Sequence, residues 1–311
     1  MTLPPFTIAL AQYPIEALAD WPAYEAKLSR WVAQAAQGGA ALAVFPEYGA
    51  MELASLDPAS MGDLAGSLGF VAGLAARVDA LHARLAQAHG LYVLAASLPV
   101  QRADGAAYVN YVNRARLFAP SGAMAHQDKA VMTRFEAERW GISAGADGLA
   151  LFDTALGRIG IAICYDSEFP LIARAFAEAG AHLLLAPSCT DSAHGYWRVR
   201  IGCQARALEG QFYVAQSPTV GDAPWSPAVD ENRGAAGLFA PPDRHAGQGW
   251  AMPADGVVAL GEMDAAQWLF AQVEPARVEA LRADGGVLNT RDWARQPGAA
   301  PLPPVRVVAL A

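Results

Sequence analysis

Cys164 stands where a predicted strand ends and a helix begins, a setting in which cysteine often serves as a nucleophile. The run Ile159–Ile163 before it is apolar and β-branched, which predicts a buried strand. After it, Asp166 or Ser167 can cap a helix expected over Leu171–Ala179. Free backbone N–H groups and a helix N-terminus at such a turn lower a thiol pKa, and only the thiolate attacks. A small buried core cysteine is the competing interpretation, so the choice depends on other residues.

Two further ionisable residues follow predicted strands. Glu47 comes just after the apolar stretch Ala41–Phe45, and Lys129 follows a predicted β-hairpin. Ligands bind at the carboxyl ends of strands in open α/β sheets, so Glu47, Lys129 and Cys164 can converge. Taken singly, each has an ordinary explanation, because a Glu at a strand end is usually solvated and a Lys after a hairpin is usually at the surface.

Strand-like and helix-like segments alternate along the chain and predict a mixed, layered α/β fold without internal repeats. The expected strands are Phe6–Gln12, Ala41–Phe45, Leu91–Leu98, Ile159–Ile163, His182–Pro187, Phe212–Gln216, Ala236–Ala240, Trp250–Met252, Val257–Leu260 and Trp268–Val273, with a hairpin of Tyr108–Ala119 and Ala123–Gln127. The expected helices are Trp21–Gln37, Gly69–His89 ended by Gly90, one from about Tyr196 to Glu209, and Pro275–Arg282.

We expect one domain over residues 1–280 and a C-terminal tail over residues 281–311. The tail ends in the apolar, strand-like stretch Val305–Leu310, so it is expected to pack on the domain or on a second subunit. The segment Val220–Gly234 is rich in Gly, Pro and Asp and predicts a long loop. Loops carry much of the specificity of enzymes, and we expect this loop to do so here.

The composition argues against several classes of partner. A net charge of −8 over 311 residues disfavours nucleic acids and anionic membranes. No run of about 18 apolar residues predicts a membrane span, and the first residues lack the pattern of a secretory signal. The three cysteines, Cys164, Cys189 and Cys203, are a sparse and odd set, which predicts free thiols in a reducing cytoplasm.

No metal or organic cofactor is expected. No Gly-x-Gly-x-x-Gly motif opens a helix after a strand, and no His-x-x-x-His or Cys-x-x-Cys pair occurs. A Cys–His pair that uses His194 or His245 stays open as an alternative, although neither lies in a recognisable motif. The histidines are scattered: His82, His89, His126, His182, His194 and His245.

The segments around the three strand-end residues together resemble motifs of the nitrilase, or carbon–nitrogen hydrolase, superfamily. The similar segments are Phe45-Pro46-Glu47, Asp128-Lys129, Cys164-Tyr165-Asp166-Ser167-Glu168-Phe169-Pro170, Ala9–Gln12, Asn110–Phe118, Ala186-Pro187-Ser188, and Gln204–Glu209, which is similar to the family's Arg-Ala-x-Glu-Asn helix although Gly210 replaces the Asn. The resemblance therefore extends from about residue 6 to residue 274. It implies a four-layer α-β-β-α sandwich whose subunits pair into a homodimer or a higher homo-oligomer.

The resemblance also implies a role for each residue. Cys164 attacks an amide carbonyl or a nitrile carbon and forms a thioester once the nitrogen leaves. Glu47 takes the thiol proton, passes it to the leaving nitrogen and later activates water, which suits a buried carboxylate with a raised pKa. Lys129 and the backbone N–H of Tyr165 stabilise the oxyanion, and no cofactor is needed.

The family usually has a second glutamate after the lysine. Glu136 and Glu138 both fit, and we favour Glu136 because it directly follows the aromatic residue of an Arg-Phe pair. Aromatic residues near the predicted strand ends either shape an acyl pocket or pack between layers: these are Tyr48, Trp140, Tyr165, Trp197 and Trp225. Of these we predict Tyr48, Trp140 and Tyr165 as substrate-binding residues, together with Cys189.

The predicted function is therefore hydrolysis of a non-peptide carbon–nitrogen bond, with a small carboxamide as the expected substrate. Hydrolysis of a nitrile or of an N-carbamoyl compound is the alternative within the superfamily. A catalytically silent binding protein is the alternative from another class, although such a protein has no chemical reason to keep Glu47, Lys129 and Cys164 together. Acyl transfer to an amine would use the same thioester.

Overall fold

Apolar strands joined side by side form the centre of the protein. The computed structural model describes residues 3–102, 110–296 and 304–310. The strands on the main path are β1 (Phe6–Pro14), β2 (Ala40–Val44), β3 (Tyr92–Gln101), β4 (Tyr111–Phe118), β5 (Met124–Asp128), β6 (Leu149–Thr154), β7 (Gly157–Ile161), β8 (Leu183–Ser188), β9 (Tyr213–Asp222) and β14 (Val305–Ala309). Their order is β14-β6-β7-β8-β9-β1-β2-β3-β4-β5. Beside this path lie β10 (Glu231–Asn232), β11 (Gly237–Phe239), β12 (Val257–Leu260) and β13 (Gln267–Val273).

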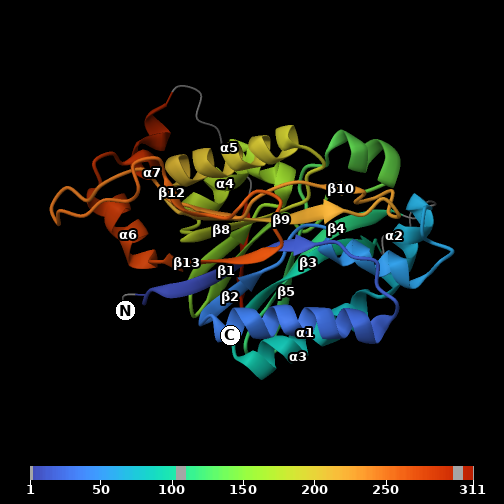
Figure 1. Ribbon diagram of the computed structural model, residues 1–311. Coiled ribbons are helices and arrows are strands. Elements are labelled where there is room, and N and C mark those ends of the chain that lie inside the picture. Colours follow the sequence, from blue (N-terminus) through green and yellow to red (C-terminus); the bar gives the residue numbers. More distant parts are fainter. Residues whose placement is uncertain (1–2, 103–109, 297–303, 311) are drawn as a thin grey trace.

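The strand path folds into two layers that helices cover on both outer faces (Figure 1). The helices α1 (Trp21–Gln37) and α3 (Ala75–His89) lie on the side of β1 to β5, and α4 (Pro170–Glu178) and α5 (Ala193–Gly210) lie on the side of β8 and β9. The remaining helical segments are α2 (Leu64–Gly73), α6 (Pro275–Asp284), α7 (Asn289–Asp292) and the short turns η1 (Gly49–Leu56), η2 (Glu136–Trp140), η3 (Cys164–Glu168) and η4 (Trp293–Arg295). The predicted α-β-β-α sandwich is confirmed.

Strand direction brings distant parts of the chain to one edge. Each neighbouring pair along β7-β8-β9-β1-β2-β3 is parallel. The strand β4 is antiparallel to β3 and β5 is antiparallel to β4, so β5 runs in the same direction as the others. The carboxyl ends of β2, β5, β7 and β8 therefore share an edge. The strand β8 is buried along its whole length, which explains its continuous apolar sequence.

Several predicted elements have different bounds in the structure. The expected helix Gly69–His89 is wrong as a single element, because α2 and α3 meet at Leu74 with a bend of 51°. Gly73 weakens the helix at that point, and the bend lets α2 pack on η1 while α3 packs on α1. Gly90 ends α3 as predicted, in the left-handed conformation.

One strand prediction also needs correction. The segment Trp250–Met252 forms only an isolated bridge between Arg244 and Ala251, because the glycines before it and Pro253 after it favour turns. The predicted hairpin is confirmed as β4 and β5, although its first predicted residues, Tyr108 and Val109, lie outside the described residues.

The C-terminal strand packs on its own domain. Val305–Ala309 pairs in parallel with Leu149–Asp153 of β6, and Leu310 is buried. The predicted boundary at residue 280 falls inside α6, in which Leu281 is also buried. The division into residues 1–280 and 281–311 stays a prediction.

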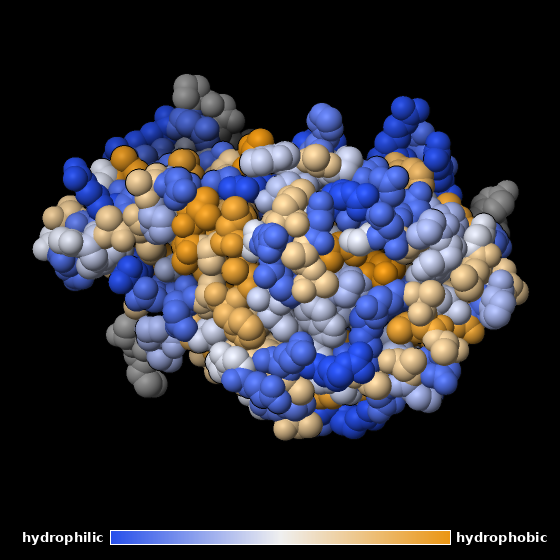
Figure 2. Space-filling view, in the orientation of Figure 1, coloured by the Kyte–Doolittle hydropathy of each residue, from blue (hydrophilic) through white to orange (hydrophobic). Residues whose placement is uncertain are grey.

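The surface is mainly polar, with apolar areas between polar ones. Figure 2 shows an apolar area over β12 and β13, where Leu260 and Phe270 are exposed. Among the described residues, no single helix is long and apolar enough to cross a membrane. The bent pair α2 and α3 meets that criterion together, by length and composition only.

A buried ion pair fixes η1, the turn that follows Glu47. Lys27 Nζ on α1 lies 2.6 Å from Glu52 Oε2 and also donates to the carbonyl oxygen of Pro14 at 2.6 Å. The hydroxyl of Tyr13 donates to the other oxygen of Glu52 at 2.6 Å. Because Lys27 and Glu52 are both buried, the loss of the Glu52 charge leaves Lys27 with only the exposed carboxylate of Glu16, 3.3 Å away, as an anionic partner.

We therefore expect Glu52→Gln to lower the free energy of unfolding by about 3 kcal/mol, the usual effect of breaking a buried pair from one side. Glu25→Gln is the matched control, because the ion pair between Glu25 and Arg84 is largely exposed and should contribute less than about 1 kcal/mol. Urea denaturation measures both values. Equal losses in the two variants would contradict this account of η1.

Candidate active site

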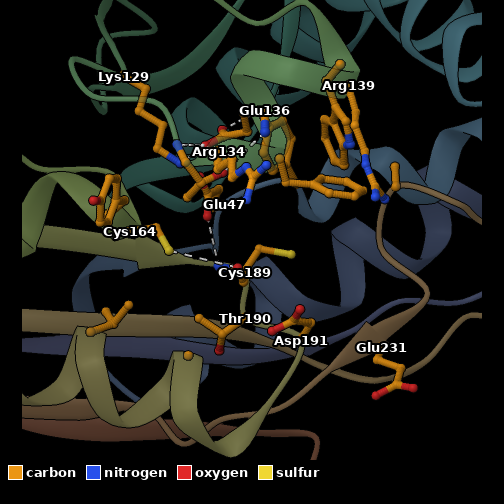
Figure 3. Close-up of a pocket in the computed structure, with 18 of the residues that line it drawn as sticks. Glu47, Lys129, Arg134, Glu136, Arg139, Cys164, Cys189, Thr190, Asp191 and Glu231 are labelled. Carbon is orange, nitrogen blue, oxygen red and sulfur yellow. Dashed lines mark hydrogen bonds and ion pairs between the residues drawn. The ribbon is translucent and has the colours of Figure 1, made fainter.

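The carboxyl ends of the aligned strands surround one pocket with a volume of about 620 Å³ (Figure 3). Glu47 follows β2, Lys129 follows β5, Cys164 follows β7 and Cys189 follows β8, and all four residues line the pocket. The convergence predicted for Glu47, Lys129 and Cys164 is thus present in the fold.

Lys129 is the centre of a buried network of charged groups. Its Nζ lies 2.7 Å from Glu47 Oε1 and 2.6 Å from Glu136 Oε2, and all three side chains are almost completely buried. The amide of Asn113 donates to Glu47 Oε1 at 2.9 Å and to Glu136 Oε1 at 3.4 Å. One ammonium group therefore pairs with two carboxylates. A proton or a second positive charge is needed to neutralise the remaining negative charge.

The two carboxylates differ in their partners, so their pKa values move apart. Glu136 also accepts hydrogen bonds from the N–H and hydroxyl of Thr133 and from the hydroxyl of Tyr48. Although burial opposes ionisation, Lys129 and Thr133 lower the pKa of Glu136 below its ordinary value. Burial raises the pKa of Glu47, and the charge of Glu136 raises it further. Glu47 is therefore the member of the pair that more readily takes a proton.

The Cys164 thiol lies beside Glu47. Its Sγ donates to the carbonyl oxygen of Cys189 at 3.9 Å, and the backbone N–H of the same Cys189 donates to Glu47 Oε2 at 3.0 Å. Burial raises the pKa of the thiol well above its ordinary value, and the charge of Glu47 raises it further. The expectation of a lowered thiol pKa is wrong, because desolvation outweighs the local N–H groups. The resting thiol keeps its proton and has a base next to it.

Two backbone positions in the site have left-handed conformations. Cys164 has φ of +48° and Tyr48, directly after Glu47, has φ of +53°. Such a conformation costs roughly 1–3 kcal/mol for a residue other than glycine, so its surroundings must hold it. The hydroxyl of Ser97 accepts from the N–H of Tyr48 at 2.9 Å. Cys164 begins the short turn η3, and the helix expected over Leu171–Ala179 follows as α4 (Pro170–Glu178). The N-cap of α4 is Phe169, so the expected capping by Asp166 or Ser167 is wrong.

The helix α5 packs against η3 and forms hydrogen bonds with it. Arg206, in the segment that resembles the family's Arg-Ala-x-Glu helix, donates to the carbonyl oxygen of Ser167 at 3.2 Å and pairs with Glu209. The hydroxyl of Ser167 in turn donates to the carbonyl oxygen of Cys164 at 2.6 Å. A side chain at Gly202 would lie 3.0 Å from the Ser167 carbonyl oxygen, so glycine allows the close approach of α5.

The structure separates the two candidates for the second glutamate. Glu136 is buried and contacts Lys129, whereas Glu138 is exposed and pairs with Arg134. Glu136, at the start of η2, is therefore the one placed in the pocket network, as we favoured.

The predicted substrate-binding residues Tyr48, Trp140, Tyr165 and Cys189 all line the pocket. The rings of Tyr48 and Trp140 also pack against each other, with centroids 4.9 Å apart, and the substrate-binding roles stay predictions. Trp197 and Trp225 do not line the pocket. The predicted loop Val220–Gly234 is wrong at its two ends, where β9 continues to Asp222 and β10 (Glu231–Asn232) pairs with it. From this segment, Pro227, Ala228, Asp230 and Glu231 form part of the pocket wall.

Two polar residues at the site were missed in the sequence. Asn113 lies on β4 between the two carboxylates, and Asp166 accepts backbone hydrogen bonds. Asn113 falls inside the segment Asn110–Phe118, and Asp166 falls inside the cysteine motif. The sequence does not reveal which residues form hydrogen bonds with either side chain. The backbone N–H of Cys189 was missed as well, and it donates to Glu47 Oε2 at 3.0 Å.

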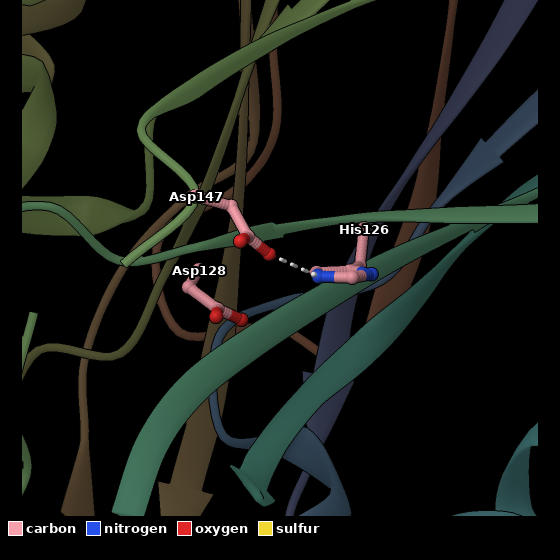
Figure 4. A group of neighbouring side chains, drawn as sticks. All are labelled: His126, Asp128 and Asp147. Carbon is pink, nitrogen blue, oxygen red and sulfur yellow. Dashed lines mark ion pairs between the residues drawn. The ribbon is translucent and has the colours of Figure 1, made fainter. Parts of the chain in front are cut away.

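The histidines lie elsewhere, since none of those in the sequence lines the pocket. His126, Asp128 and Asp147 form a group whose geometry would suit a metal ion (Figure 4). Both oxygens of Asp128 already accept from Arg114, at 2.6 and 2.8 Å, and His126 pairs with Asp147. A metal ion would have to displace the guanidinium of Arg114, so this group fits an ion-pair network better. The three cysteines are free thiols, as predicted.

Comparisons with known proteins agree with this arrangement. The family model "Carbon-nitrogen hydrolase" matches residues 7–252. The probable hydrolase YhcX of Bacillus subtilis is 33% identical over 291 residues, which cover 94% of this chain and 54% of that protein. Omega-amidase NIT2-B of Xenopus laevis is 28% identical over 160 residues, 49% of this chain and 52% of that protein. The chain spans about half the length of the curated relatives it matches.

Solved structures share the fold. An amidase from Nesterenkonia sp. superposes with a TM-score of 0.65 at 20% identity and covers 93% of this chain and 96% of that one. A variant of the amidase from Nesterenkonia sp. AN1 shows covalent addition of the acetamide moiety of fluoroacetamide at its active-site cysteine. The family model covers most of the chain, and the four-layer architecture agrees with it. The chain therefore belongs to the carbon–nitrogen hydrolase family of the nitrilase superfamily.

Proposed function

We propose that this protein hydrolyses the carbon–nitrogen bond of a small carboxamide through a thioester on Cys164. The observation that carries the proposal is the contact of Lys129 with both Glu47 and Glu136 beside the thiol, inside a pocket. A thiol, a base and a positive charge are the groups that amide cleavage by a cysteine requires. The names of two relatives, an omega-amidase and an amidase, favour an amide over a nitrile or an N-carbamoyl compound.

The reaction begins with the thiol proton. Sγ of Cys164 bonds to the amide carbon while its proton passes to Glu47, and the electron pair of the carbonyl moves to its oxygen. The ammonium of Lys129 and the backbone N–H of Tyr165 stabilise that oxyanion. When the carbonyl re-forms, the C–N bond breaks, Glu47 returns the proton to the nitrogen, and ammonia leaves.

Hydrolysis of the thioester repeats the same steps with water. Glu47 takes a proton from the water, whose oxygen bonds to the thioester carbon, and the C–S bond breaks as the thiolate regains the proton. Glu136 keeps the ammonium of Lys129 in place and, through its charge, keeps Glu47 basic. The carboxylic acid product leaves the pocket. If an amine attacked the thioester in place of water, the acyl group would be transferred to that amine.

Incubation with a panel of amides, nitriles and N-carbamoyl compounds tests the proposal. We expect ammonia release from at least one small amide and an acyl adduct on Cys164 by intact mass, with both lost in Cys164→Ala. Cys203→Ala is the matched control, because Cys203 is equally buried but does not line the pocket, so its activity should persist. Ammonia release that survives Cys164→Ala would refute the mechanism, and no adduct from any compound would favour a silent binding protein.

The raised pKa of Glu47 predicts that activity declines at low pH, which gives the pH profile of kcat/KM an acid limb. Because Glu47 must be ionised to accept the thiol proton, kcat/KM should rise with pH through a pKa above the ordinary carboxyl value of 4.5. The pKa of Lys129 is raised well above 10.5 by the two carboxylates, so its charge persists as the pH rises. The substitution Glu136→Gln removes a negative charge near Glu47 and leaves Glu47 as the one carboxylate paired with Lys129. Both changes lower the pKa of Glu47. The acid limb of this variant should move to lower pH, and a fixed limb or a move to higher pH would count against the assignment.

We further propose that the protein is a homodimer that pairs through α5. Trp197, Ile201 and Leu208 lie on one face of this outer helix and are exposed by 44–61%. A second copy on this face would continue the layers of the sandwich. The expected cytoplasmic location and the expected lack of nucleic-acid and membrane partners stay predictions.

Light scattering tests the dimer. We expect Ile201→Glu to halve the molar mass, because a charge in an apolar interface must lose its water. Leu260→Glu is the matched control, since Leu260 is an exposed apolar residue of β12 on another surface. If Leu260→Glu dissociates the dimer and Ile201→Glu does not, the interface lies elsewhere.

A further inference from the structure

Asp166 is a buried carboxylate with no part in the proposed proton transfers. The residue is 2% exposed and does not line the pocket, although it lies two positions after Cys164. The N–H groups of Ala130 and Val131 donate to its oxygens at 3.2 and 2.8 Å, and the N–H of Ile163 donates at 3.1 Å. A charged group buried at this depth needs such compensation, and here backbone donors supply it.

These hydrogen bonds join two segments that are far apart in the sequence. A capping or turn residue would contact only its own neighbours, as Asp166 does with Ile163. Ala130 and Val131 are 36 and 35 residues away from Asp166. One segment begins directly after Lys129, and the other ends directly before Cys164. The carboxylate therefore connects the backbone that carries the ammonium to the backbone that carries the thiol.

The other backbone contacts of Lys129 are with segments that do not carry the thiol. The N–H of Lys129 donates to the carbonyl oxygen of Asn113 on β4 at 2.9 Å, and its own carbonyl oxygen accepts from Gly145 at 3.2 Å. These contacts join Lys129 to β4 and to the segment between η2 and β6. Burial raises the pKa of Asp166 to about 7, while the charge of Lys129 and the three backbone donors favour its ionised form.

We propose that Asp166 is a positioning residue that sets the distance between the Lys129 ammonium and the Cys164 thiol. The inference rests on the proposed function, in which Lys129 faces the oxyanion formed on the carbon that Cys164 attacks. Substrate binding does not need this distance to be fixed, but stabilisation of the oxyanion does. Asp166 therefore acts on the chemical step through Lys129 and has no contact with the substrate.

Asp166→Asn tests the proposal with little change in volume. One carboxamide oxygen can accept from the Lys129 segment or from Ile163, but the NH₂ group then faces the other N–H donor, so one side of the connection is lost. We expect kcat for the best amide to fall by roughly 100-fold, the effect of a displacement of about 1 Å at a reacting group. KM should stay within about threefold, because ground-state binding is unchanged.

Asp79→Asn is the matched control for a purely structural effect. Asp79 pairs with the buried Arg116 at 2.7 Å, and neither residue lines the pocket. This variant should lose thermal stability and keep its kcat. An equal loss of kcat in the two variants would overturn the proposal, as would a kcat of Asp166→Asn within twofold of the wild type.

Hydrogen exchange of the wild-type protein gives a second test that needs no variant. The N–H groups of Ala130 and Val131 lie after a strand end and would exchange quickly without Asp166. We expect them to be as strongly protected as the N–H groups of β5, and rapid exchange at both would overturn the proposal. Wild-type ammonia release is measured in parallel. If it is absent for every amide the proposed function fails, whereas its presence with an unaffected Asp166→Asn rejects only the role of Asp166.

Discussion

The site depends on one ammonium group shared by two buried carboxylates. Lys129 lies within 2.7 Å of an oxygen of both Glu47 and Glu136, where little water can compensate a charge. Two negative charges against one positive charge leave an excess that burial makes costly. Glu136 has the better set of donors and keeps its charge, so the excess falls on Glu47. Burial and the charge of Glu136 thereby give Glu47 its affinity for a proton, and the Cys164 thiol lies beside it.

The fold supplies this arrangement through strand direction. The strands β2, β5, β7 and β8 run the same way, so the residues that follow them meet at one edge. Strand ends alone give only approximate positions. The left-handed conformations of Tyr48 and Cys164 turn the chain sharply at that edge. Ser97 accepts from the N–H of Tyr48, and Ser167 and Arg206 donate to backbone oxygens of η3. The strain is local, and the layers around it are well packed.

Much of the fold could be predicted from the sequence, because apolar periodicity reports burial directly. The strand of Ala41–Phe45 and the helix Trp21–Gln37 are close to their predicted bounds. The break between α2 and α3 could not be predicted in this way, since Ala and Leu continue at helical spacing through Leu74 and only tertiary packing requires the bend. The short strands β6 and β10 were missed because their sequences lack a clear period.

The site was predicted at the level of residue types, but its electrostatics were not. The motifs around Glu47, Lys129 and Cys164 identified residues that do line one pocket. The thiol pKa was predicted in the wrong direction, because a sequence shows the turn but not the depth of burial. The contacts of Asn113 and Asp166 join strands and loops far apart in the chain, and no local pattern reveals them.

Infrared difference spectroscopy of the carboxyl groups tests the central claim most directly, because it detects the proton on Glu47 itself. A pH titration of the wild-type protein should show a protonated carboxyl band that appears at a pH above the ordinary value of 4.5. Asp166, whose pKa is raised to about 7, should contribute a protonated carboxyl band in every variant. The additional band of Glu47 should be absent in Glu47→Gln and present, at lower pH, in Glu136→Gln. A band that persists in Glu47→Gln and disappears in Glu136→Gln would place the proton on the wrong carboxylate and contradict the account.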